Sequence, residues 1–153
     1  MATDASKQTG NVRLVRPRDA GRMAELAGEM GYPATREEMV ARVERLGGDP
    51  LKVAYVAEDD DGTVVGWVEA RRRDLLLSEG SAEIVGLVVA ADTRGRGWGR
   101  QLIETVAAWA CDHGCHRLRI RTNIRREEAR AIYTHLGFHE AKQQVVFDRD
   151  LTA

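Results

Sequence analysis

The sequence is short of the residues that mark several large classes of protein. Cysteine accounts for 2 of its 153 residues, which excludes a disulfide framework. It has no long uncharged apolar run, which excludes a membrane-embedded chain. Neither sign of charge is in excess: 23 Lys and Arg against 24 Asp and Glu give a net charge of −1, which excludes a nucleic-acid binder built on overall basicity. With 43% hydrophobic residues, the chain is predicted to fold around a core.

The length and the first residues predict the domain organisation. Because a domain has on the order of 150 residues, a chain of 153 residues predicts one domain. Residues 1–11 (MATDASKQTGN) are polar and lack the apolar stretch of a secretion signal. We therefore expect a disordered tail over residues 1–11, a single domain over residues 12–153, and a cytoplasmic location.

Alternating apolar and charged residues predict strands, and apolar residues at helical spacing predict helices. Their order is β-α-α-β-β-β-α-β-α-β, which is typical of an α/β protein with a mixed central sheet of six to seven strands and four helices on its faces. We expect the strands at 12–16, 52–58, 63–73, 82–89 and 117–122, with one long or two short strands over 138–151. The helices are expected from Asp19 to Gly31, over 35–46, after Gly99 and over 127–136.

One segment joins a buried strand, a glycine-rich loop and a helix. Residues 82–89 (AEIVGLVV) are too continuously apolar to be half exposed, so they predict a central strand, and Gly86 within it predicts a β-bulge or a close backbone approach. Residues 94–99 (RGRGWG) precede a helix whose first backbone N–H groups have no intrahelical partner. The glycines let this backbone approach a ligand, while the helix dipole and the arginines favour an anion. The segment predicts a phosphate or pyrophosphate site, with a glycine-rich turn and solvated arginines as the alternative.

The residues of this segment resemble the acetyl-CoA motif of the GNAT N-acetyltransferases, [Q/R]-x-x-G-x-[G/A], through Arg94, Gly97 and Gly99. A second family signature, A-x-x-x-Y-x-x-x-G-F, is matched by residues 129–138, and the two motifs come in the family's order. The resemblance implies the acyl-CoA N-acyltransferase (GNAT) fold, with a mostly antiparallel sheet. It also implies an enzyme that moves the acetyl group of acetyl-CoA directly to a primary amine of a small molecule or protein in a ternary complex, without a metal.

The same resemblance implies roles for individual residues. The amides around Gly95–Arg100 would hold the cofactor pyrophosphate, and the backbone of Leu87–Val89 would pair with the pantetheine arm. The amide of Leu87 or Val88 would stabilise the oxyanion of the tetrahedral intermediate. Many members of the family have Asn where this chain has Arg126, and Asn123 is the substitute. The implied cofactor-binding residues are Leu87, Val88, Val89, Arg94, Gly95, Arg96, Gly97, Trp98, Gly99, Arg100, Asn123 and Tyr133.

Two side chains are the candidate catalytic residues. Glu83 lies eleven positions before Arg94, the spacing of the glutamate base in one branch of the family, and would deprotonate the acceptor amine. Its alternative is a solvated glutamate at the start of a strand. Tyr133 would protonate the departing CoA thiolate, with a packing tyrosine as the alternative. Cys111 and His113 are two apart in a predicted helix and face different directions, so no metal site is expected.

The acceptor is expected to contact the first two helices and the loop after Arg73. These segments carry several acidic residues, which favour a cationic amine such as a polyamine, an aminoglycoside-like compound or a lysine. The candidate acceptor contacts are Glu29, Tyr32 and Glu83, with Glu37, Glu38, Asp74 and Glu79 as further acidic groups.

Two further expectations concern partners and the class of function. Residues 137–151 resemble the ending of short acetyltransferases that pair or exchange C-terminal strands, so a homodimer is expected. The alternative function is a catalytically silent acetyl-CoA sensor or interaction module.

Overall fold

The computed structural model describes residues 10–122 and 124–152. Their contacts divide the chain into two compact units, with the boundary between Ile120 and Arg121. The first unit contains the sheet and three helices, and the second contains one helix, α4 (Glu127–His135).

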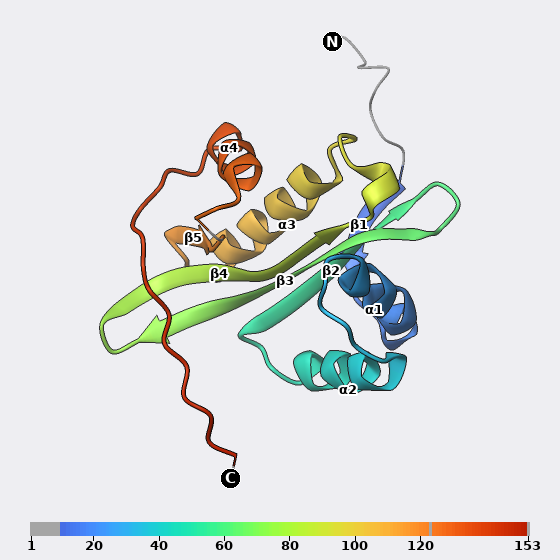
Figure 1. Cartoon of the computed structure of the whole chain (residues 1–153), viewed down its shortest axis with the longest axis horizontal. Helices are drawn as coiled ribbons and strands as arrows, with labels where there is room; N and C mark the ends of the chain where they lie inside the picture. The colour runs from blue at the N-terminus through green and yellow to red at the C-terminus, as the bar shows by residue number, and fades with distance from the viewer. Residues whose placement is uncertain (1–9, 123, 153) are drawn as a thin grey trace. The chain divides into compact units, whose positions relative to one another are not determined.

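The first unit is built on a five-stranded sheet in the order β1-β2-β3-β4-β5 (Figure 1). Neighbours from β1 to β4 are antiparallel, whereas β5 is parallel to β4. The α/β class and the mixed, mostly antiparallel sheet are therefore confirmed. The strands are β1 (Gly10–Leu14), β2 (Lys52–Asp59), β3 (Val64–Leu75), β4 (Ser78–Val89) and β5 (Arg117–Ile120).

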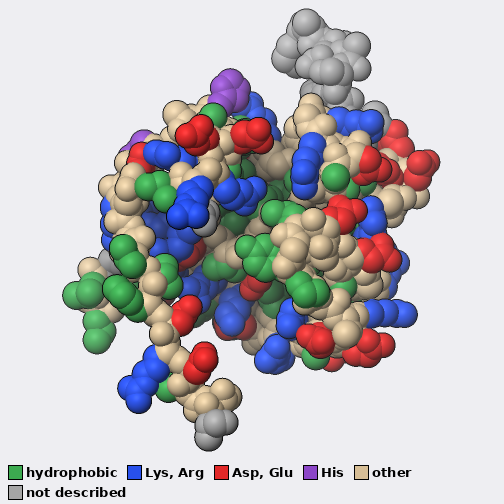
Figure 2. All heavy atoms as spheres, in the orientation of Figure 1, with side chains coloured by type: hydrophobic (Ala, Val, Ile, Leu, Met, Phe, Trp, Pro, Cys, Tyr) green, Lys and Arg blue, Asp and Glu red, His purple; other side chains and the backbone are tan. Residues whose placement is uncertain are grey.

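Helices cover both faces of this sheet (Figure 1). On one face, α1 (Ala20–Glu29) and α2 (Arg36–Gly47) pack on a core that includes Val56 and Val88. On the other face lies α3 (Trp98–Asp112), whose Leu102 approaches Gly66. Side chains of both charges are interspersed over α1 and α2 (Figure 2). The four predicted helices are thus present in the described chain.

The sheet has five strands rather than the six to seven predicted. The missing strands were expected over residues 138–151, and no strand is found over residues 138–152. Val145, Val146 and Phe147 in this segment are 78–89% exposed. Their β-branched and aromatic side chains favour an extended backbone, but a strand also needs a neighbour to complete its hydrogen bonds, and that neighbour cannot be read from a local pattern.

The first strand begins earlier than predicted. Gly10 and Asn11, which were expected in a disordered tail over residues 1–11, belong to β1 and pair with Asp59 and Glu58. Residues 1–9 of that expected tail lie outside the described part of the chain.

Of the two features that Gly86 predicts, β4 contains the β-bulge, and the close approach to Gly86 is made by a side chain rather than by backbone. Glu69 of β3 pairs with Gly86 and Ala70 pairs with Ile84, so Val85 is an extra residue that forms a β-bulge in β4. A Cβ placed on Gly86 would lie only 3.0 Å from Cζ3 of Trp67. The extra residue shifts the pairing of β4 with β3 by one position between the residues before the bulge and those after it. This shift determines which residues of β3 lie beside Glu83, the candidate base.

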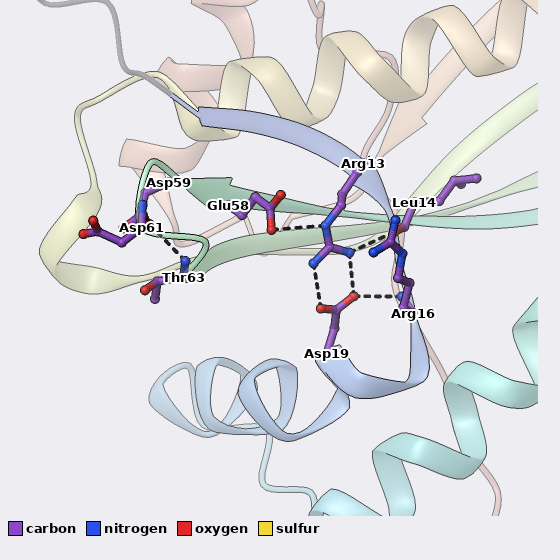
Figure 3. Close-up of polar contacts among 8 residues, drawn as sticks. All are labelled: Arg13, Leu14, Arg16, Asp19, Glu58, Asp59, Asp61 and Thr63. Carbon is purple, nitrogen blue, oxygen red and sulfur yellow. Dashed lines mark hydrogen bonds and ion pairs between the residues drawn. The ribbon is translucent and has the colours of Figure 1, made fainter.

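A buried ion pair fixes the start of α1 against the sheet (Figure 3). Asp19, only 4% exposed, accepts two hydrogen bonds of 2.9 Å from Arg13 and one of 2.7 Å from the backbone N–H of Arg16. Arg13 also lies 3.2 Å from Glu58 of β2. Burial alone would raise the pKa of Asp19, but the hydrogen bonds from Arg13 and Arg16 outweigh it, so the pKa is lowered.

We expect Asp19→Asn to lower the free energy of unfolding by about 3 kcal/mol at pH 7, because it removes one partner of a buried ion pair. Since folding depresses the pKa of Asp19, its stabilisation is full above the unfolded-state pKa of about 3.9 and is lost as the pH falls below it. Urea unfolding should therefore show a smaller difference between wild type and variant at pH 3 than at pH 7. The exposed Asp61→Asn serves as the control, and equal stability of Asp19→Asn and wild type at pH 7 would contradict the prediction.

Candidate active site

The glycine-rich loop ends at the N-terminus of α3. Gly95 and Gly97 have φ of +83° and +86°, a left-handed backbone that other residues rarely adopt. Gly97 is the N-cap of α3, and it supplies no side-chain hydrogen bond to the first turn of the helix. Apart from Gly95 and its two chain neighbours, no described atom lies within 4 Å of the position where a Cβ on Gly95 would stand. The loop therefore offers backbone donors and open space to an anion.

The arginines of the loop are exposed to solvent, whereas its tryptophan is buried. Arg94, Arg96 and Arg100 are exposed, and Nε of Arg94 donates to the carbonyl oxygen of Val89 at 3.4 Å. Trp98 is 3% exposed and packs in the core, so only its backbone is available to a ligand. The arginines are placed to add positive charge around the loop.

One edge of β4 lacks a neighbouring strand just before the loop. β5 pairs with β4 only from Ser81 to Ile84, and no described strand pairs with that edge from Val85 to Val89. Unpaired backbone groups at a sheet edge bind an extended ligand as an additional strand would. The predicted cofactor contacts of Leu87, Val88 and Val89 therefore lie on a free edge that leads into the glycine loop.

Glu83 is buried, so the alternative of a solvated glutamate at the start of a strand is wrong. Its side chain is 5% exposed, and its Oε2 lies 2.7 Å from Nη1 of Arg73. In the backbone register it stands between Arg71 of β3 and Arg119 of β5. Sequence reasoning missed Arg73 because the partner depends on the pairing of β3 with β4 beyond the bulge.

Glu69 is a second carboxylate of the sheet, and the sequence analysis did not select it. It is half-buried on β3, opposite Gly86 at the bulge. Burial raises its pKa, while the charges of Lys52 and Arg71 act in the opposite direction. The signal in the sequence is a single acidic residue in an otherwise apolar and glycine stretch, residues 64–70 (VVGWVEA).

Tyr133 lies in α4 of the second unit. Its ring is half-buried and meets the ring of Phe138 edge to face, with centroids 6.0 Å apart. Burial raises the pKa of its phenol, and the charge of Arg126 partly counteracts this shift. A phenol with a raised pKa keeps its proton at neutral pH, so Tyr133 can act as a proton donor.

Two of the three candidate acceptor contacts, Glu29 and Tyr32, lie at and after the end of α1, whereas Glu83 lies on β4. Glu29 and Tyr32 are exposed, and Tyr32 is 71% exposed. Asp74 is paired with Arg72 at 3.0 Å, which leaves it less available to an amine. The side chain of Glu79 and the whole of Asn123 lie outside the described residues.

The described residues contain no group of three or more His, Cys, Asp and Glu that could hold a metal ion. Cys111 is exposed and Cys115 is buried, and both are free thiols. Among the helices described, none has the length and apolar character needed to cross a bilayer.

Comparisons with known proteins agree on one family. A model of the family described as "Acetyltransferase (GNAT) family" matches residues 22–138. An aminoglycoside N(6')-acetyltransferase type 1 of Stenotrophomonas maltophilia is 27% identical over 140 residues, which cover 89% of this chain and 90% of that enzyme. The enzyme of the same name from Salmonella typhimurium is 30% identical over 93 residues, covering 58% of this chain and 63% of the relative.

Solved structures show the same fold. The structure of AAC(6')-Iy in complex with the bisubstrate analog CoA-S-monomethyl-acetylneamine matches with a TM-score of 0.81 and 20% identity, over 92% of this chain and 98% of that one. Glucosamine-6-phosphate N-acetyltransferase from Arabidopsis thaliana matches with a TM-score of 0.80 and 20% identity, over 94% of this chain and 100% of that one. At this identity the structural likeness establishes the fold.

Proposed function

The chain belongs to the acetyltransferase (GNAT) family and transfers the acetyl group of acetyl-CoA to an amine, and we propose that its acceptor is a primary amine of a polycationic small molecule, foremost an amino sugar. The observation that carries the proposal is the free edge of β4 from Val85 to Val89, which leads directly into the glycine loop. Such an edge suits the extended, amide-containing arm of acetyl-CoA, and the loop suits its pyrophosphate. The names of the curated relatives support the amino sugar.

The proposed reaction uses two side chains and one backbone amide. Glu83 takes a proton from the acceptor ammonium, and the free amine attacks the thioester carbonyl carbon. The amide of Leu87 or Val88 donates a hydrogen bond to the oxyanion, after which the C–S bond breaks. Tyr133 gives its phenolic proton to the departing thiolate, and the new amide nitrogen loses its remaining extra proton to solvent, which reprotonates the phenolate. Arg73 positions the carboxylate of Glu83 through the 2.7 Å ion pair.

The remaining cofactor contacts belong to the same proposal. Arg94, Arg96 and Arg100 add charge around the pyrophosphate, while Asn123 contributes from the segment before α4. We propose that the chain from β1 onward acts as one acetyltransferase domain. The free thiols of Cys111 and Cys115 suit a reducing compartment, which supports the proposed cytoplasmic location.

A thiol-release assay over a panel of amines tests the proposed function. The panel should contain neamine, spermidine, a lysine peptide and a blank without amine. We expect CoA release with neamine well above the blank. If calorimetry shows acetyl-CoA binding while no amine causes release, the chain is the catalytically silent sensor instead.

Tyr133→Phe removes one hydroxyl and keeps the ring that packs on Phe138. We expect the affinity for acetyl-CoA to change little and kcat to fall by about 10²-fold, the lower end of what a positioned acid contributes. Steady-state kinetics with calorimetry of acetyl-CoA binding separates the two quantities. A kcat within twofold of wild type would make Tyr133 a packing residue.

We also propose that the protein is a homodimer assembled through its C-terminal segment. Apolar side chains at Val145, Val146 and Phe147 are exposed in a segment without a partner strand in the described chain. A charge there opposes burial against a second copy. Val146→Asp should therefore shift the mass measured by light scattering from dimer to monomer, whereas Leu51→Asp, at an exposed position of the first unit, should not. A monomeric wild type would contradict the proposal.

A further inference from the structure

The carboxylate of Glu69 lies in a position that disfavours the folded state. It is half-buried on β3, and no described side chain or backbone group forms a hydrogen bond or ion pair with it. Burial of an unpaired charge disfavours the folded state, and here it raises the pKa of Glu69. Lys52 and Arg71 influence this carboxyl only through their charge, without an ion pair within bonding distance. A carboxylate that lowers the stability of the folded protein and has a shifted pKa is a candidate for binding a ligand.

The position of Glu69 places it beside the proposed thioester site. Its partner across the ladder is Gly86, which has no side chain, and Gly86 immediately precedes the amides of Leu87 and Val88. Trp67, two residues before Glu69 on the same face of β3, reaches over Gly86 to within 3.0 Å of a Cβ placed there. The carboxylate therefore stands at the rim of the bulge.

Glu69 shares its sheet face with the proposed base. Residues 69, 71 and 73 alternate onto one face of β3, and Arg73 on that face meets Glu83 at 2.7 Å. Cross-strand diagonal neighbours on one face are about 7 Å apart. The two carboxylates differ in one respect: Glu83 already holds an arginine, whereas Glu69 holds no cation within ion-pair distance among the described residues.

The charge of the surrounding surface does not by itself select a cation. Over α1 and α2, acidic and basic side chains are interspersed rather than segregated (Figure 2). The net charge of the whole chain is −1. Selection of a polycationic acceptor therefore needs a local carboxylate near the reacting atoms, and Glu69 is such a group.

We propose that Glu69 binds a second ammonium of the acceptor, while the reacting amine is delivered to Glu83. This inference rests on the proposed function and assigns it a substrate class: amines that carry a further ammonium a few bonds from the reacting nitrogen. A monoamine would leave Glu69 without a partner. Acceptor binding then supplies the ion pair that this carboxylate lacks in the folded protein.

Glu69→Gln tests the inference, because it keeps the shape and removes the charge. The probes are neamine, which carries several amines, and 6-amino-6-deoxyglucose, which carries only one. We expect the variant to raise the KM for neamine by about 10- to 100-fold, the range for a lost charge-assisted hydrogen bond, with kcat within about twofold. The KM for 6-amino-6-deoxyglucose should not change. Glu25→Gln, an exposed carboxylate on α1, is the matched control and should alter neither value.

Two further measurements keep the test decisive. Calorimetry of neamine binding to the protein–CoA complex should show the same loss in Glu69→Gln without depending on turnover. The melting temperature of Glu69→Gln should equal or exceed that of wild type, since the substitution removes an unpaired buried charge. If wild type neither binds nor acetylates neamine, the proposed function fails. If wild type binds and acetylates neamine but Glu69→Gln has the same KM for it, the inference about Glu69 alone is overturned. The same holds if Glu69→Gln raises the KM for neamine and for 6-amino-6-deoxyglucose equally.

Discussion

Gly97→Glu is expected to abolish CoA binding while the fold persists. Gly97 has φ of +86° and is the N-cap of α3, at the point where backbone N–H groups would meet the pyrophosphate. A glutamate there places a carboxylate against an anion, and such a like-charge contact costs several kcal/mol. Since each factor of ten in affinity corresponds to about 1.4 kcal/mol, calorimetry should show a loss of at least about 10³-fold.

A second substitution at the same position separates charge from backbone strain. Asn tolerates the left-handed conformation better than other non-glycine residues and carries no charge. We therefore expect Gly97→Asn to retain measurable CoA binding, with a melting temperature equal to or above that of Gly97→Glu. Unchanged affinity in Gly97→Glu would show that the pyrophosphate lies elsewhere.

The features predicted well from the sequence are those that depend on neighbouring residues. The bulge beside Gly86 and the glycine-rich loop before α3 both follow from glycines at special places in a short segment. The start of the helix expected over residues 35–46 is equally local, because Thr35 accepts a hydrogen bond of 3.1 Å from the backbone N–H of Glu38. Each of these structures is specified within a few residues.

The features that the sequence analysis missed depend on strand register. Glu83 was expected to be a base or a solvated side chain, and its burial against Arg73 follows only when β3 and β4 are aligned beyond the bulge. Glu69 was missed for the same reason, because its importance comes from the glycine opposite it. A one-residue slip of β4 against β3 would move Glu83 to the face of the sheet opposite Glu69.

The missing C-terminal strands illustrate another limit. The strands predicted over residues 138–151 rest on β propensity alone, whereas a strand also needs hydrogen-bonding partners, which can belong to another molecule. The exposed Val145, Val146 and Phe147 are what such a segment presents when its own chain supplies no neighbouring strand.

Glu83→Gln should lower kcat for neamine by about 10³-fold at pH 6, within the range that a positioned base contributes. The amide can still accept a hydrogen bond from Arg73, and Arg73 is 20% exposed, so we expect the fold to survive. Circular dichroism and the melting temperature check this. Glu104→Gln, which makes the same charge change at an exposed position of α3, is the control.

The pH profile of this variant decides the role of the carboxylate. An amine with a pKa near 10.4 is almost wholly protonated at pH 6, and the free form increases about 10³-fold by pH 9. An enzyme without its base uses only free amine, so the activity of Glu83→Gln relative to wild type should recover as the pH rises. An equal loss at every pH would instead assign Glu83 to binding the amine, and its ion pair with Arg73 would then align a binding group. No loss at any pH would leave water as the proton acceptor, because the amine would then reach the thioester already deprotonated.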